Sequence, residues 1–79
     1  MKTTQHFEER LRKRGLSMKA VEEALEREEE REVQDDGRIC IWGRPKGWNL
    51  YLRVVVLPDG ETMLTAFPDS DFTRKQSRQ

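Results

Sequence analysis

Histidine, arginine and hydroxyl side chains occur in patterns that could act on a phosphodiester. The single histidine, His6, and Arg10 lie one helical turn apart in the segment HFEERLRKRGLS. Tyr51 and Arg53 alternate in YLRVVVL, and Thr65 lies in ETMLTAF. Metal-independent cleavage of RNA needs a base for the 2′-hydroxyl proton, an acid for the leaving oxygen, and cations where charge builds on the phosphorus. These residue types can supply each role.

Histidine is the side-chain type that can take or give a proton near neutral pH, so His6 suits either proton role. In the first turn of a helix, with Arg10 at the next turn, its protonated form is disfavoured by the helix dipole and by the neighbouring cation. This position favours a base over an acid. The alternative interpretation is a solvent-facing or helix-capping histidine.

The strand residues are also open to two interpretations. Arg53, in the middle of a Val/Leu strand, either extends along the sheet face to reach solvent or holds an anion as a planar bidentate donor to phosphate. Tyr51 or Thr65 could donate or position a proton. Thr65 is otherwise a residue type that is common in strands.

The segment WGRPKGWN forms a second candidate site. Trp42 and Trp48 are interleaved with Arg44 and Lys46, a pattern that could stack nucleotide bases and hold phosphates. The alternative is a hairpin loop whose Trp rings cover the edge of a small core.

Two short helices must position the N-terminal residues. Thr3 or Thr4 can cap the first helix, and Gly15 fits the left-handed position that ends it. Ser17 can cap a second helix, whose apolar stripe is Met18, Val21, Ala24 and Leu25. The run EREEERE has nothing to bury, so this helix is predicted to end or fray between residues 27 and 31.

The rest of the chain has the alternation typical of strands. Residues 38–42, 48–57 and 61–67 predict three strands, with residues 30–33 as an optional fourth. Together these elements predict an α+β domain, with an N-terminal two-helix hairpin packed on one face of a three- to four-stranded antiparallel β meander. Alternation assigns Leu50, Leu52, Val54, Val56, Thr62, Leu64 and Ala66 to the helix face, and Tyr51, Arg53, Val55, Met63, Thr65 and Phe67 to the other. Residues 1–72 form one domain, and residues 73–79 are expected to be a flexible basic tail.

Overall composition limits the classes of function. The 79 residues contain 15 basic and 15 acidic side chains, yet nine acids and only two arginines lie between Glu22 and Asp36. That run is either a solvated surface or a surface that meets a basic partner or repels nucleic acid. One Cys and one His cannot supply a zinc site, so no metal or cofactor is expected, and Cys40 is interpreted as structural. Without an apolar run of membrane-spanning length, the expected location is cytoplasmic, as a monomer or a dimer.

The order of short motifs resembles a bacterial domain family of unknown function. H-x3-R-x3-RG-L-S is followed by AVEEAL, DDGR, LRVVV and TAFP, which together span residues 6–68. That family is similar in fold to the RelE/ParE-like and BrnT-like toxins, and more broadly to barnase-like ribonuclease toxins. The matching residues are His6, Arg10, Arg14, Gly15, Arg53, Thr65, Phe67 and Pro68. REEERE and the basic loop GRPKGWN depart from the family's pattern.

The resemblance implies an activity and partners. The related toxins use a histidine of the first helix with an arginine and a hydroxyl residue of the sheet to cleave RNA. By that resemblance His6, Arg53 and Thr65 are expected catalytic residues, and Tyr51 joins them as a side chain that could donate or position a proton. RNA and a neutralising protein are the expected partners, and the alternative is a non-catalytic module that binds RNA or protein through its sheet face. The expected substrate-binding residues are Arg10, Arg14, Trp42, Arg44, Lys46 and Trp48.

Overall fold

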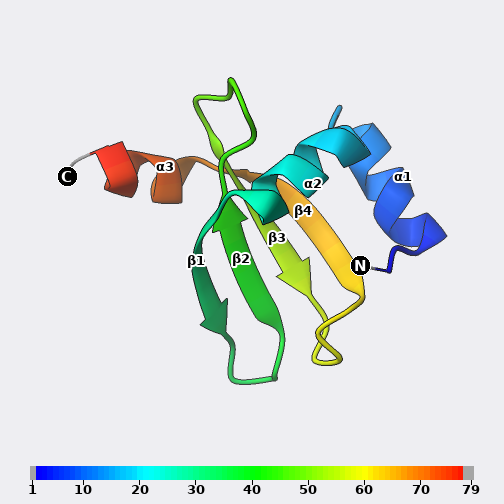
Figure 1. Cartoon of the computed structure of the whole chain (residues 1–79). Coiled ribbons are helices and arrows are strands. Elements are labelled where there is room, and N and C mark those ends of the chain that lie inside the picture. Colours follow the sequence, from blue (N-terminus) through cyan, green and yellow to red (C-terminus); the bar gives the residue numbers. More distant parts are fainter. Residues whose placement is uncertain (1, 78–79) are drawn as a thin grey trace.

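The chain forms a four-stranded sheet with helices on both of its faces (Figure 1). The computed structural model describes residues 2–77. In chain order the elements are α1 (Gln5–Lys13), α2 (Met18–Glu26), β1 (Glu28–Val33), β2 (Ile39–Gly43), β3 (Tyr51–Val56), β4 (Met63–Asp69) and α3 (Ser70–Ser77). The strands follow one another as an antiparallel meander, β1-β2-β3-β4. The predicted α+β class and helix hairpin are confirmed, and the optional fourth strand is present.

Side-chain caps fix the helix hairpin. The Thr4 hydroxyl accepts a hydrogen bond from the Phe7 amide at 3.1 Å, and the Ser17 hydroxyl accepts one from the Ala20 amide at 3.1 Å. Between the helices, Gly15 has a φ of 70° and the Leu16 amide donates to the Leu11 carbonyl. This is the left-handed closure that glycine permits at a helix end.

The acidic segment 22–36 is shared between α2 and β1, the strand at the edge of the sheet. Helix α2 ends at Glu26, and β1 begins two residues later at Glu28. Acids at a helix C-terminus oppose the helix dipole, whereas on an exposed strand they remain in water. All six residues of β1 are exposed, so the strand carries charge without burying it.

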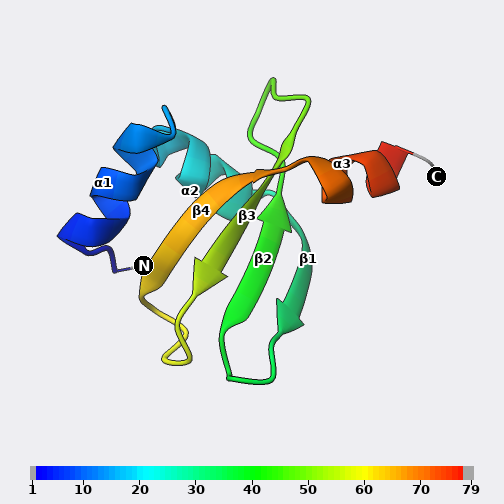
Figure 2. The ribbon, with the colours of Figure 1, turned by 180° about the vertical axis from the view of Figure 1, so that it is seen from behind.

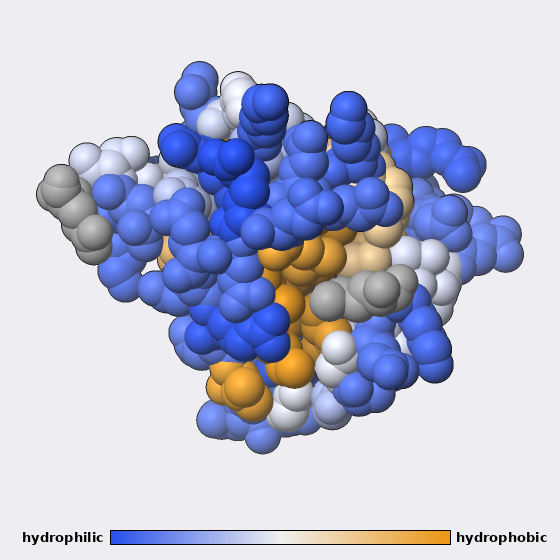
Figure 3. Space-filling model, viewed as in Figure 1, coloured by the Kyte–Doolittle hydropathy of each residue, from blue (hydrophilic) through white to orange (hydrophobic). Residues whose placement is uncertain are grey.

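Helices α1 and α2 cover one face of the sheet and form the main core with it. Its buried members are Phe7, Leu11, Ala20, Val21, Ala24, Ile41, Leu52, Val54, Val56, Met63 and Ala66. The backbone of α2 lies directly on β2, because a Cβ added at Gly43 would lie 1.8 Å from the Ala24 carbonyl oxygen. Apolar surface remains visible on this face below α2 (Figure 3).

The opposite face has a smaller apolar cluster, made of Cys40, Trp42, Tyr51, Val55 and Phe72. Helix α3 lies across one end of this face (Figure 2). Its Phe72 ring stacks on Trp42 at 5.0 Å and meets Tyr51 edge-on at 5.1 Å. Where the sequence suggests a flexible tail from residue 73, the structure has α3 continuing to Ser77; residues 78 and 79 of that tail lie outside the described residues.

The predicted faces of Met63 and Leu64 were wrong. Val55 pairs with Thr65 but Val56 pairs with Met63, so the register shifts by one residue between these pairs. This β-bulge places Met63 in the helix-side core and packs Leu64 against the opposite cluster. Beyond the bulge, Thr65, Ala66 and Phe67 follow the predicted alternation.

Replacing Gly43 by alanine tests the close packing of α2 on β2. Because the new methyl group would overlap the α2 backbone, we expect Gly43→Ala to lower the free energy of unfolding by about 2–4 kcal/mol. Urea denaturation would measure it. The matched control is Gly47→Ala, which has open space around its Cβ but a positive φ, and should cost about 1 kcal/mol. Equal losses in the two variants would contradict this packing.

Candidate functional site

Arg53 lies at the centre of the sheet face opposite α1 and α2, between two aromatic rings. In the strand register it pairs with Trp42 of β2 on one side and Phe67 of β4 on the other. Its guanidinium carbon lies 5.3 Å from the Trp42 ring centroid and 5.7 Å from that of Phe67. Contacts of this geometry stabilise a cation that is partly removed from water.

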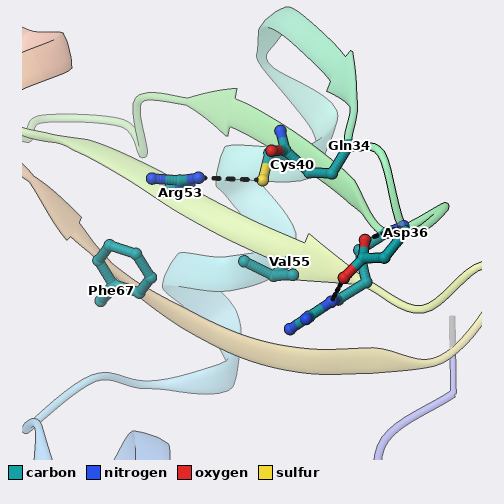
Figure 4. A pocket seen from close by; sticks show the side chains of 7 residues that line it. Gln34, Asp36, Cys40, Arg53, Val55 and Phe67 are labelled. Carbon is teal, nitrogen blue, oxygen red and sulfur yellow. Dashed lines mark hydrogen bonds and ion pairs between the residues drawn. The ribbon is translucent and has the colours of Figure 1, made fainter.

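The Arg53 guanidinium has unused hydrogen-bonding capacity. Its Nη2 donates to the Cys40 Sγ at 3.3 Å (Figure 4), and its buried Nε has no hydrogen-bond partner among residues 2–77. Within the same residues, no carboxylate lies within ion-pair distance of Arg53. A half-buried cation without a paired carboxylate can bind an anion through its planar donors.

A hollow of about 310 Å³ opens beside Arg53. It is lined by Gln34, Asp36, Arg38, Cys40, Arg53, Val55 and Phe67. Asp36 and Arg38 pair with each other at 2.6 Å, so their charges are satisfied, and they lie across the hollow from Phe67 (Figure 4). The hollow therefore combines the apolar side chains of Val55 and Phe67 with Arg53, a cation that has no ion-pair partner within residues 2–77.

Arg14 brings a second guanidinium to the same face. From the C-terminal cap of α1, its Nη1 donates to the Thr65 hydroxyl at 3.1 Å and to the Ala66 carbonyl at 3.5 Å. Its Cζ lies 5.9 Å from the Phe67 ring centroid, so the Arg14 and Arg53 guanidiniums approach one aromatic ring. We call Arg14, Arg53, Thr65 and Phe67 the two-arginine site.

Asp69 joins α3 to the sheet at the end of this face. One carboxylate oxygen accepts from the Phe72 amide at 2.9 Å and caps α3, and the other accepts from Trp42 Nε1 at 3.0 Å. Burial raises the pKa of Asp69, but these two hydrogen bonds and the positive charge of Arg53 outweigh it and hold the pKa below its ordinary value. The side chain is therefore a carboxylate at neutral pH.

Tyr51 is buried in the smaller apolar cluster, next to Phe72. Interaction with the Glu29 carboxylate, together with burial, raises the pKa of Tyr51, although the nearby Arg44 acts in the opposite direction. The Arg44 guanidinium lies over the Tyr51 ring at 5.7 Å. A phenol with a raised pKa remains protonated at neutral pH, so Tyr51 can donate a hydrogen bond but does not serve as a base.

The structure does not bring His6 to this face. His6 is exposed on α1, in the helical layer, and Arg10 is half-buried one turn later. The Arg53 side chain lies on the other face of the sheet, with Trp42 and Cys40. Within residues 2–77 no hydrogen bond joins His6 to Arg53 or to Thr65.

The segment 42–49 does not present its two tryptophans as a stacking platform. Trp42 is buried under Phe72, and Trp48 is half-buried against the helix-side core. Arg44 and Lys46 are exposed. The half-buried aromatic ring beside the arginines is Phe67, which strand alternation placed on the face of Arg53 and which the TAFP motif also contains.

Comparisons with known proteins add no assignment: no protein-family model matches the chain, nor does any curated protein or solved structure. Over residues 2–77 there is no group of three or more His, Cys, Asp or Glu side chains placed to hold a metal ion. In that same range no helix has the length and apolar character needed to cross a membrane.

Removing the Asp69 carboxylate should release α3. We expect Asp69→Ala to lower the free energy of unfolding by about 2 kcal/mol at pH 7, since it removes a helix cap and the bond to Trp42. Because the folded-state pKa is lowered, this stabilisation is present above the ordinary carboxyl pKa and is lost as the pH falls through the folded-state value. Denaturation curves between pH 7 and pH 2 would measure it.

The matched control is Asp71→Ala, which removes an exposed carboxylate from the first turn of the same helix. It should change the free energy of unfolding by less than about 0.5 kcal/mol. A difference between Asp69→Ala and the wild type that stays constant down to pH 2 would contradict the assigned role of Asp69.

Proposed function

We propose that this domain binds single-stranded RNA and holds a phosphate group at the two-arginine site. The observation that carries the proposal is the pair of guanidiniums, Arg14 and Arg53, beside the Phe67 ring. Neither has an ion-pair partner among the described residues. The Thr65 hydroxyl adds a further polar group at the same place.

On the sheet face opposite α1 and α2, positive and negative side chains lie on different sides, so a polyanion would bind on the side of the arginines. Arg53 belongs to β3, Arg14 reaches β4 from the end of α1, and Arg44 reaches Tyr51 of β3 from the loop after β2. Each guanidinium lies over an aromatic ring. Glu30 and Glu32 of β1 occupy the other side, in register with Trp42 and Cys40. The phosphates of a bound strand would therefore follow the arginines and avoid β1.

Phe67 supports a single-stranded ligand over a duplex. Its ring is half-buried, lines the hollow and has unpaired cations nearby. Unstacked bases can lie against such a ring, whereas bases within an A-form duplex are not free to do so.

The family resemblance supports RNA as the ligand. Arg14, Arg53, Thr65 and Phe67 match that family's motif, and here they gather at one site although they come from α1, β3 and β4. We infer a RelE- or BrnT-like domain in which these residues face the nucleic acid. One fold hosts many activities, so this inference rests on the site rather than on the topology.

Metal-independent cleavage of RNA is the second candidate function. It is favoured by the Arg53 guanidinium, a donor group that has no ion-pair partner among the described residues and could bind a phosphorane oxygen. Cleavage also needs a proton acceptor, and His6 lies in the helical layer away from this donor. Binding without cleavage is therefore the function that the geometry supports best.

Binding of a fluorescent 12-nucleotide single-stranded RNA, followed by anisotropy at low salt, tests the proposal. Loss of a charged hydrogen bond to phosphate is worth about 1.5–3 kcal/mol, so Arg53→Gln and Arg14→Gln should each raise Kd by roughly 10- to 100-fold. The matched control is Arg12→Gln, an exposed arginine of α1, which should leave Kd within about twofold. Circular dichroism would confirm that the variants are folded.

The same samples, separated on a denaturing gel, distinguish the two candidates. Intact RNA with arginine-dependent binding supports the binding module. Cleavage that His6→Ala abolishes would replace it with the ribonuclease. If both arginine variants bind RNA as tightly as the wild type, the two-arginine site is not the interface and the proposal fails.

A further inference from the structure

We propose that the free edge of β1 accepts an extended, basic segment of a partner protein as a fifth strand of the sheet. Strand β1 is the first in the order β1-β2-β3-β4, and no strand of residues 2–77 pairs with its outer edge. All six of its residues are exposed. The alternate N–H and C=O groups along such an edge are available to another chain.

The other edge of the sheet is partly closed by the chain itself. The Lys2 amide donates to the Glu61 carbonyl, and the Met63 amide donates to the Lys2 carbonyl, so the N-terminal segment pairs beside the start of β4. Further along, Arg14 reaches the Ala66 carbonyl. Among residues 2–77, the edge of β1 is therefore the one to which no segment pairs.

On the sheet face covered by α1 and α2, apolar side chains from four neighbouring strands lie in a row that ends at Val33 of the edge strand β1. In the strand register, Val33 is opposite Ile39, Ile39 is opposite Val56, and Val56 is opposite Met63. Val56 and Met63 are buried and Ile39 is half-buried, whereas Val33 is 66% exposed. Figure 3 shows this apolar surface reaching the lower left of the molecule, where β1 ends in Figure 1. An added strand with an apolar residue opposite Val33 would continue the row.

The acidic side chains of β1 define the charge of the partner. Glu30 and Glu32 share a face with Trp42 and Cys40, and neither forms an ion pair with another described residue. By contrast, the Glu28 carboxylate receives two hydrogen bonds from Arg31, at 2.8 and 2.9 Å. Lysine or arginine at alternate positions of an added strand would lie opposite Glu30 and Glu32, at the spacing where cross-strand charge pairs interact.

A second copy of this chain does not fit the same edge. Pairing of β1 with another β1 would bring glutamates of the two strands together, and like charges opposite one another are destabilising. The occupant is therefore a basic strand from a different protein.

A synthetic peptide can test the inference without RNA. The probe is a seven-residue peptide of alternating lysine and valine, acetylated and amidated, with a fluorophore for anisotropy. The double variant Glu30→Gln/Glu32→Gln should bind it about 3- to 10-fold more weakly than the wild type, since two cross-strand charge pairs are lost. The matched control is Glu22→Gln/Glu26→Gln, which removes two exposed acids from α2 and should bind within about twofold of the wild type.

A second measurement separates strand addition from simple charge attraction. With saturating peptide, backbone amide exchange in residues 29–33 should slow at least tenfold, and a peptide N-methylated at alternate residues should lose binding. Equal binding of the two peptides, unchanged amide exchange in β1, or equal losses in the two glutamate variants would each overturn the proposal. None of these measurements uses RNA, so their outcome does not depend on whether the domain binds RNA.

Discussion

The two central strands carry apolar side chains on both faces, and this constraint determines how the rest of the chain is arranged. Ile41 and Val54 face α1 and α2, whereas Cys40 and Val55 face the opposite side. A sheet with apolar side chains on both faces needs a covering layer on each face to remove that surface from water. In the described part of the chain, two helices cover one face and only α3, which packs through Phe72, covers the other. Part of the second face is therefore left open.

Arg53 occupies that open part. A guanidinium placed among Trp42, Phe67 and Cys40 loses part of its hydration, and the aromatic contacts and one weak hydrogen bond to sulfur offset this loss only partly. Asp69 contributes a favourable charge nearby, but its oxygens already accept from Trp42 and the Phe72 amide. The proposed phosphate at Arg53 would supply interactions that the described residues leave unmade.

Sequence patterns predicted the elements much better than the contacts between them. Ser17 and Gly15 act locally, and their roles as cap and helix terminator were confirmed. The β-bulge beside Met63 was not predicted, because alternation alone carries no information about register. Helix α3 has one buried apolar residue, so its pattern is too weak to recognise. The contact of Arg14 with Thr65 joins residues 51 positions apart, and no local spacing could reveal it. Arg14 and Thr65 both match the family motif, but the motif does not predict that they contact each other.

The two tryptophans lie on opposite sides of the sheet, and this gives the molecule a pair of internal optical reporters. Trp42 stacks on Phe72, so its fluorescence depends on the docking of α3. Trp48 packs against the helix-side core and is independent of α3. Helix α3 is held by the Phe72 ring, the Asp69 cap and the Thr73 hydroxyl, which accepts from the Tyr51 amide at 2.9 Å, so loss of these contacts would change the surroundings of Trp42 and leave those of Trp48 unchanged. Spectra of single-tryptophan chains would then separate local opening at the arginine face from global unfolding.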